Sequence, residues 1–294
     1  MKNSTDFLFE KALQKKSPAL SKRYSDCISV FDTLLQKFQA VFPTFTDHSL
    51  LHSMNVMNYS NILMGKQAEK LSAGALYAYM MAVALHDVGM TVNENQFSVF
   101  CRDAGIEEEV RNSPELSHTE ISRKYHNDFS AIFIRKYYSL FDIPDASYAR
   151  AIAQIARGHR KADLLNETDY PADFKTADGS CINLPLLGAL IRLADELDMS
   201  KDRSLSLLYE IDPQADYSQV SALEFAKCDS IRSIECNDDR ILITCRTNSD
   251  VVRNAVIAYA DELQVKLDYC RQVIAARSDF AFPYQTVELI TEPA

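Results

Sequence analysis

Apolar residues recur mostly at intervals of three and four from residue 5 to about residue 200, which is the period of an amphipathic α-helix. Glycine, proline and polar stretches interrupt this pattern often enough to predict about seven or eight helices. The interruptions fall at Pro43, Gly89, Pro114, Pro144, Gly158 and through 166–180. We therefore expect residues 1–204 to form one helical domain.

The pattern changes after Arg203, where short apolar segments alternate with helical ones. Alternation and turn residues predict strands at 205–211, 231–236, 241–246 and 285–290, with helices at 218–228 and 250–277. The order β-α-β-β-α-β is that of a ferredoxin-like split βαβ module. The expected fold is mainly α, a helical bundle followed by a smaller α/β accessory module at 205–294.

A chain of 294 residues with 47% hydrophobic residues buries a large core without a metal or disulfide to hold it together. Any metal site is therefore expected to serve a function. Seven cysteines without a CxxC pair indicate reduced thiols of a cytoplasmic protein. No signal-peptide pattern opens the sequence, and the longest apolar run, 73–85, is too short to cross a bilayer, so we expect no membrane partner.

The charge balance narrows the class of ligand. A formal net charge of -10 repels polyanions, which argues against binding of long nucleic acids. A small anionic substrate held by local cationic side chains remains compatible with this charge.

The histidines carry the first sign of chemistry, because all six lie between residues 48 and 159. His48 and His52 are four residues apart and should share one face near a helix N-terminus. His86 and Asp87 end the most apolar segment, where burying an imidazole and a carboxylate is costly without partners. Either a divalent cation or a self-satisfied His-Asp hydrogen bond would supply that partner. His118 is expected only as an N-terminal helix residue.

Two aspartates compete for a further ligand position near residue 195. Asp195 falls at the edge of the inward stripe formed by Leu187, Ile191 and Ala194, and a carboxylate facing the core suggests a ligand. Asp198 is the competing choice, or a residue that caps or pairs at the end of the helix.

Taken in order, HxxxH, ALHDVGM, RKYHNDFSAIFI, IARGHR and LIRLADELD resemble the HD superfamily of metal-dependent phosphohydrolases, and most closely its clade E (HD-CE) branch. The resemblance covers residues 43 to about 203. It implies one or two divalent transition metal ions such as iron, manganese or zinc. The implied first-metal ligands are His52, His86, Asp87 and Asp195, and the implied second-metal ligands are Asp87 as a bridge, His126 and His159.

The resemblance also implies roles in catalysis. Two cations sharing Asp87 would activate a bridging water for attack on phosphorus. His48 corresponds to the general acid of the phosphodiesterase branch, with a surface or capping histidine as the alternative. Met90 departs from the family pattern, because many members carry a lysine there.

Cationic residues near the implied ligands are candidates for substrate binding. Arg157, Arg160 and Lys161 surround His159, and Arg192 precedes Asp195 by three positions. Such side chains are suited to phosphate oxygens, and the alternative interpretation is a solvated charge run.

We therefore expect a metal-dependent phosphohydrolase acting on a nucleotide-like phosphomonoester or phosphodiester. One alternative is a di-iron oxygenase that uses the same ligands. Another is a noncatalytic nucleotide-binding sensor whose C-terminal module contacts a protein partner or a second copy. A nuclease ranks last, because no long basic tract accompanies the motifs.

Overall fold

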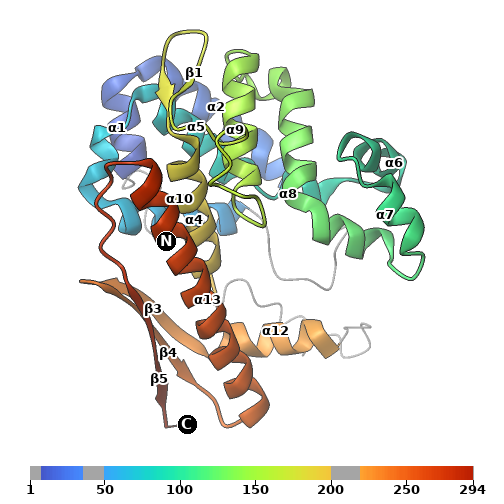
Figure 1. The fold of residues 1–294 in the computed structure, drawn as a ribbon, viewed down its shortest axis with the longest axis vertical. Coiled ribbons are helices and arrows are strands. Elements are labelled where there is room, and N and C mark those ends of the chain that lie inside the picture. The colour runs from blue at the N-terminus through green and yellow to red at the C-terminus, as the bar shows by residue number, and fades with distance from the viewer. Residues whose placement is uncertain (1–7, 36–49, 200–218, 294) are drawn as a thin grey trace.

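The structure is a computed structural model that describes residues 8–35, 50–199 and 219–293. It is mainly helical with two small sheets, so the expected mainly α fold with a C-terminal α/β module is confirmed (Figure 1). His48, the expected strand 205–211 and the expected domain boundary at residue 204 lie outside the described residues.

Nine α-helices occupy the described part of the chain before residue 200, somewhat more than predicted. Two of the additional breaks fall between Lys16 and Pro18 and at Gly105, whose positive φ of 71° favours glycine. The α-helices are α1 (Leu8–Lys16), α2 (Pro18–Leu35), α4 (Leu50–Met64), α5 (Ala73–Leu85), α6 (Glu94–Asp103), α7 (Glu107–Asn112), α8 (His118–Tyr137), α9 (Ala146–Arg157) and α10 (Leu184–Leu197).

Short elements connect these helices. The 3₁₀ helices are η2 (Gly65–Lys70), η3 (Val88–Thr91) and η4 (Tyr138–Phe141), and the antiparallel hairpin of β1 (Phe174–Lys175) and β2 (Cys181–Ile182) lies within and just after the expected polar break. Helix starts follow capping chemistry, because the side chains of Ser117, Asp145 and Asn183 accept backbone N–H bonds at the beginning of α8, α9 and α10.

Helix α5 is the central element of the helical part. It is apolar on every side, and all its residues from Gly74 to Leu85 are buried, as expected of a helix surrounded by others. Its C-terminal end therefore delivers His86 and Asp87 to the interior. Among the described residues no single helix is long and apolar enough to cross a membrane, and only the bent pair Ala73–Thr91 and Glu94–Asp103 meets the length and composition criteria.

The C-terminal elements confirm both predicted helices and three of the four predicted strands. They are α12 (Gln219–Ser230), β3 (Ile231–Asn237), β4 (Arg240–Arg246), α13 (Asp250–Arg277) and β5 (Thr286–Glu292). Asp238, with φ of 50°, lies in the turn that joins β3 and β4 as an antiparallel hairpin. All seven cysteines of the chain are free thiols, as predicted.

The ferredoxin-like strand order is wrong. In a split βαβ module the first strand separates the third from the fourth. Here β4 pairs directly and in parallel with β5, from Arg240 opposite Thr286 to Arg246 opposite Glu292. Alternation along a strand identifies its buried face but not its neighbour, so the sequence predicted the elements without their pairing.

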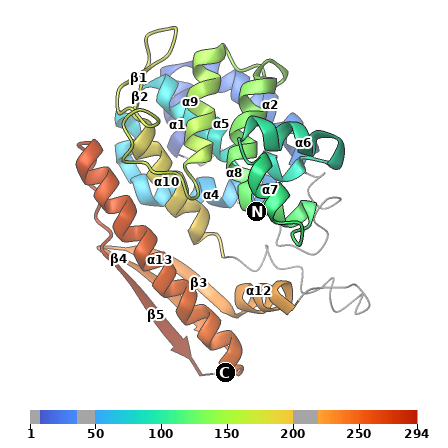
Figure 2. The ribbon, with the colours of Figure 1, turned by 45° about the vertical axis from the view of Figure 1, so that its right-hand side comes forward.

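Helix α13 joins the two parts of the molecule. It packs against α10 of the helical part and against β5 and α12 of the C-terminal part (Figure 2). Buried side chains of both parts, including Leu193 of α10, Leu267 of α13 and Ile243 of β4, belong to one continuous hydrophobic cluster. The C-terminal elements are thus packed onto the helices that carry the candidate site.

Candidate metal centre

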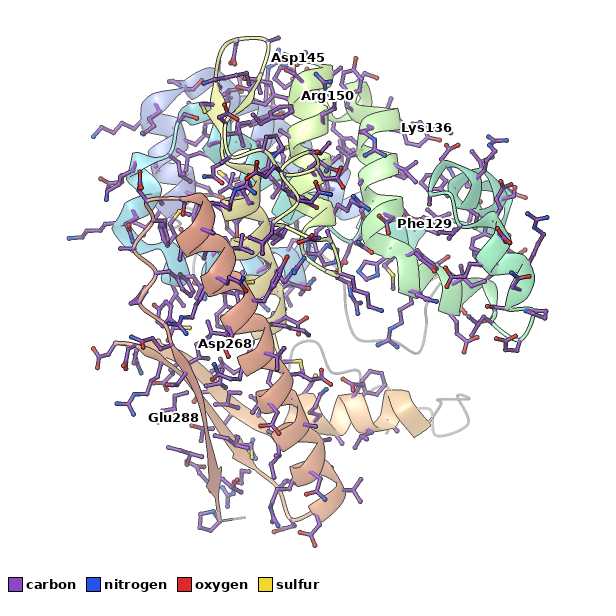
Figure 3. The ribbon with its side chains drawn as sticks, in the orientation of Figure 1. Phe129, Lys136, Asp145, Arg150, Asp268 and Glu288 are labelled. Carbon is purple, nitrogen blue, oxygen red and sulfur yellow. The ribbon has the colours of Figure 1, made fainter. Side chains whose placement is uncertain are left out.

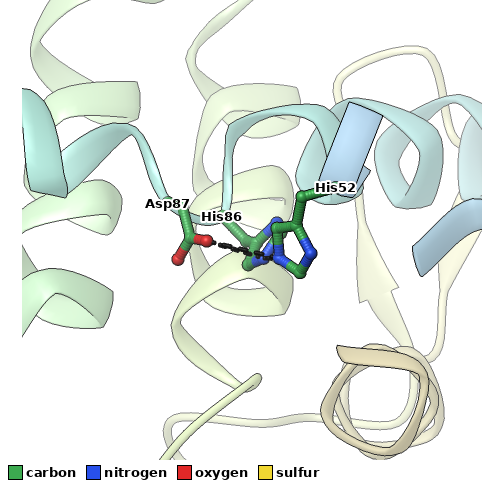
Figure 4. A group of neighbouring side chains, drawn as sticks. All are labelled: His52, His86 and Asp87. Atoms are coloured by element: carbon green, nitrogen blue, oxygen red, sulfur yellow. Dashed lines mark hydrogen bonds and ion pairs between the residues drawn. The ribbon is translucent and has the colours of Figure 1, made fainter. Parts of the chain in front are cut away.

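The first group of candidate ligands comes from α4, the end of α5 and α10. His52 Nε2 lies 3.1 Å from His86 Nε2, and Asp87 Oδ2 lies 3.4 and 3.2 Å from these two nitrogens. Figure 4 shows the three side chains gathered at the end of α5. Asp195 adds a carboxylate oxygen 3.2 Å from His52 Nε2 and 3.6 Å from His86 Nε2. The four side chains converge on one point.

The second group uses the other oxygen of the same aspartate. Asp87 Oδ1 lies 3.3 Å from His126 Nε2 and 3.8 Å from His159 Nε2, and these two nitrogens are 2.9 Å apart. His126 lies on α8, and His159 follows the end of α9. Asp87 therefore stands between the two groups, one oxygen toward each, as a bridging ligand would.

The Nδ1 atom of each of the four histidines in these two groups already has a hydrogen-bond partner. The Nδ1 atoms of His86, His126 and His159 donate to the backbone carbonyls of the residues three positions earlier, at 2.8, 2.7 and 2.6 Å. His52 Nδ1 donates to Asp198 Oδ2 at 2.7 Å. Because a carbonyl or carboxylate oxygen accepts only, Nδ1 carries a proton in each ring, and a metal ion would bind at Nε2 once that atom is deprotonated. Such partners orient histidine ligands of metals.

Burial and neighbouring charges shift the pKa of three side chains in the centre. Burial alone would lower the pKa of His86, but the carboxylates of Asp87 and Asp195 raise it well above its ordinary value. Burial, followed by the positive charges of His86 and His126, holds the pKa of His159 well below its ordinary value. Burial would raise the pKa of Asp195, yet hydrogen bonds from His52 and His86 lower it well below the usual range. The imidazoles of His52 and His86 thus stabilise Asp195 as an anion.

The spacing of the ligand atoms suits metal ions. Two ligand atoms bound at about 2.1 Å and at right angles around one ion lie about 3 Å apart. The Nε2 pairs, at 3.1 and 2.9 Å, match this separation. The groups His52-His86-Asp87 and Asp87-His126-His159 are buried and each is compact enough to hold one ion. The mixture of imidazole and carboxylate ligands is typical of iron, manganese and zinc sites.

The geometry separates the two competing aspartates. Asp195 faces the Nε2 side of His52, whereas Asp198 is fully buried on the Nδ1 side and also accepts from Asn55 Nδ2 at 3.1 Å. This arrangement favours Asp195 as a ligand and Asp198 as the group that orients His52. The sequence did not reveal Asn55, although its position three residues after His52 places both on one helix face.

The cationic residues around His159 differ in their exposure and in their ion pairs. Arg157 donates through Nε to Asp128 Oδ1 at 2.6 Å and is also 3.7 Å from Asp169. Arg160 and Lys161 are exposed. Arg157 and Lys161 line a cavity of about 230 Å³ whose lining includes no candidate ligand, so their role in substrate binding stays a prediction.

Arg192 has a different environment from the one predicted. Its guanidinium is buried and donates to the carbonyl oxygens of Gly158 at 2.9 Å and Ala162 at 2.6 Å. These contacts favour a structural role for Arg192 over the predicted contact with phosphate. His118 begins α8, as predicted, and belongs to neither ligand group.

Gly89 allows the turn that follows Asp87 to approach α8. Its N–H donates to Ser130 Oγ at 2.8 Å, and an added Cβ would lie 2.5 Å from Ser130 N and closer still to the carbonyl oxygen of His126. Neither backbone atom can move without shifting α8.

We expect Gly89→Ala to destabilise the metal-free protein by about 1–3 kcal/mol, the usual cost of overpacking. Denaturant unfolding measures this change. Ser130→Ala is the control, because it removes only one hydrogen bond and should cost about 1 kcal/mol. Wild-type stability of Gly89→Ala would show that η3 lies farther from α8 than described.

A family model described as HD-CE matches residues 42–278. The chain belongs to the HD-CE family. The match includes all six predicted ligands and continues through α12, β3, β4 and α13, beyond residue 203 where the recognisable motifs end. No match was found among curated proteins or among solved structures.

Proposed function

We propose that this HD-CE protein is a metal-dependent phosphohydrolase that cleaves a nucleotide-like phosphomonoester or phosphodiester. The observation that carries the proposal is the convergence of four imidazole Nε2 atoms on the two oxygens of Asp87. Metal ions held there would polarise a phosphoryl oxygen and lower the pKa of a bound water.

The protein's own side chains supply the remaining requirements. Asp87 and Asp195 provide negative charge, and the hydrogen bonds at Nδ1 hold the imidazoles in the tautomer that binds metal. Lys161 and Arg157 line one cavity, and their cationic side chains would suit an anionic group of the substrate. His48 is proposed as the general acid on the strength of its position in the sequence.

Two other functions use the same side chains. A di-iron oxygenase would need the same six ligands, and a noncatalytic sensor would bind a nucleotide at the same site without turnover. The net charge of -10 argues against a long nucleic acid as the ligand in all three cases.

The test begins with elemental analysis of the purified, untagged protein. We expect close to two equivalents of iron, manganese or zinc per chain. The loaded protein is then assayed, with and without oxygen, on p-nitrophenyl phosphate, bis(p-nitrophenyl) phosphate and a panel of nucleotides.

Hydrolysis that is independent of oxygen and lost with chelator would support the proposal. Oxygen consumption with the phosphoesters untouched would favour the oxygenase. Nucleotide binding without turnover, with metal present, would favour the sensor. Absence of metal after reconstitution would overturn the metal centre itself.

A further inference from the structure

We propose that helix α13 of the C-terminal part positions both ligand groups of the metal centre, through Tyr259 for the first group and Tyr269 for the second. The inference rests on the proposed metal centre, and it assigns to the C-terminal elements a role in metal binding. Tyr259 and Tyr269 are positioning residues, because neither contacts a candidate ligand directly. Each bonds instead to the backbone near a ligand, Tyr259 at Glu196 and Tyr269 at Leu164.

The first contact is at the end of α10. Tyr259 Oη donates to the backbone carbonyl oxygen of Glu196 at 2.7 Å, and Lys266 Nζ lies 2.6 Å from the Glu196 carboxylate. Glu196 stands between Asp195 and Leu197, the last residue of α10. The last four carbonyls of a helix have no partner within it, so a donor from another element stabilises this turn against fraying. The same turn carries Asp195 and leads directly into Asp198.

The second contact is at the segment that carries His159. The Arg192 guanidinium donates hydrogen bonds to the backbone carbonyls of both Gly158 and Ala162. It also lies over the ring of Tyr269, 5.0 Å from the ring centroid. Tyr269 Oη accepts from the N–H of Leu164 at 2.8 Å. It also donates to Asp163 Oδ1 at 3.2 Å. The loop from residue 158 to residue 164 is thus held on both sides by Arg192 and α13.

One rigid element makes both contacts. Ten residues of α-helix separate Tyr259 from Tyr269, a distance of about 15 Å at 1.5 Å per residue. Figures 1 and 2 show α13 running alongside α10 from the sheet to the helical part. Each tyrosine supports a different ligand group. Substitution of one tyrosine should therefore weaken the binding of one metal ion more than the binding of the other.

The experiment uses Co²⁺ as the probe, because its visible absorption reports the geometry of each bound ion. Full-length His126→Ala protein retains the first group, and full-length His52→Ala protein retains the second. Tyr259→Phe and Tyr269→Phe are added to each, and Co²⁺ affinity and absorption are measured. Tyr284→Phe is the matched control, since its hydroxyl also donates to a backbone carbonyl, that of Ile62 at 3.4 Å, away from both groups.

We expect Tyr259→Phe to weaken Co²⁺ binding about tenfold in the His126→Ala protein and to shift its absorption, as loss of an outer support does. Tyr269→Phe should do the same only in the His52→Ala protein. Lys266→Gln provides a second variant at the first contact, with a smaller loss in the same direction, should Tyr259→Phe fold poorly.

Equal affinities in the Tyr259→Phe, Tyr269→Phe and Tyr284→Phe proteins would overturn the inference while leaving the metal centre intact. Equal losses in both ligand groups would overturn the assignment of one tyrosine to each group. Absence of Co²⁺ binding by the wild type would instead overturn the proposed centre, and with it this inference.

Discussion

Asp87→Ala protein is expected to lose both metal ions and all phosphoester hydrolysis together. The physical reason is that each oxygen of this carboxylate faces a different pair of imidazoles, Oδ2 toward His52 and His86 and Oδ1 toward His126 and His159. Without Asp87, each metal ion loses one anionic ligand. Binding of the ion then becomes unfavourable, because a buried cation needs nearby negative charge to compensate it. Elemental analysis and the phosphoester assay measure the two losses.

Asp268→Ala is the matched control for this change. Asp268 is an exposed aspartate of α13, labelled in Figure 3, and among the described residues its side chain bonds to Gln264 and Arg271 of its own helix. It should keep wild-type metal content and activity. An Asp87→Ala protein that retains one full equivalent of metal would show that Asp87 does not bridge, and that one group holds its ion without it.

Asp195→Ala is expected to weaken the first metal site far more than Asp198→Ala. Asp195 Oδ1 lies among the Nε2 atoms, so its removal deletes a ligand and an anionic charge. Asp198 contacts the opposite nitrogen of His52, so its removal releases the orientation and tautomer of a ring that still reaches the ion. Loss of an outer partner of this kind typically costs about 10–100-fold in affinity.

The measurement is Co²⁺ affinity in the His126→Ala background, which isolates the first site. Asp198→Asn is a useful companion, because it retains the shape of the side chain while removing its charge. A larger loss with Asp198→Ala than with Asp195→Ala would reverse the assignment of ligand and orienting residue.

The helices and strands were predictable to the extent that their signals are local. The apolar run that forms α5 and the three- and four-residue spacing of apolar residues are properties of neighbouring positions, so the class of fold followed from them. The hairpin of β1 and β2 was missed, because two-residue strands in a polar stretch carry no periodicity.

The candidate ligands were identified by residue type and by the resemblance of their motifs, and the structure brings all six together. Their contacts were not predictable in the same way. Arg192 was expected near a phosphate because it stands three residues before Asp195. Its partners Gly158 and Ala162 lie 34 and 30 residues earlier in the chain, and no local pattern reveals them.

By itself, the sequence determined that this protein is mainly helical, that its C-terminal third mixes strands and helices, and which histidines and aspartates are available to a metal. Only the tertiary structure decided that Asp195 faces Nε2 of His52, that Asp198 faces Nδ1 of the same ring, and that β4 pairs with β5. The reason is physical. Periodicity and side-chain chemistry are properties of neighbouring residues, whereas the orientation of a ring or the partner of a strand depends on residues far apart in the chain that packing brings into contact.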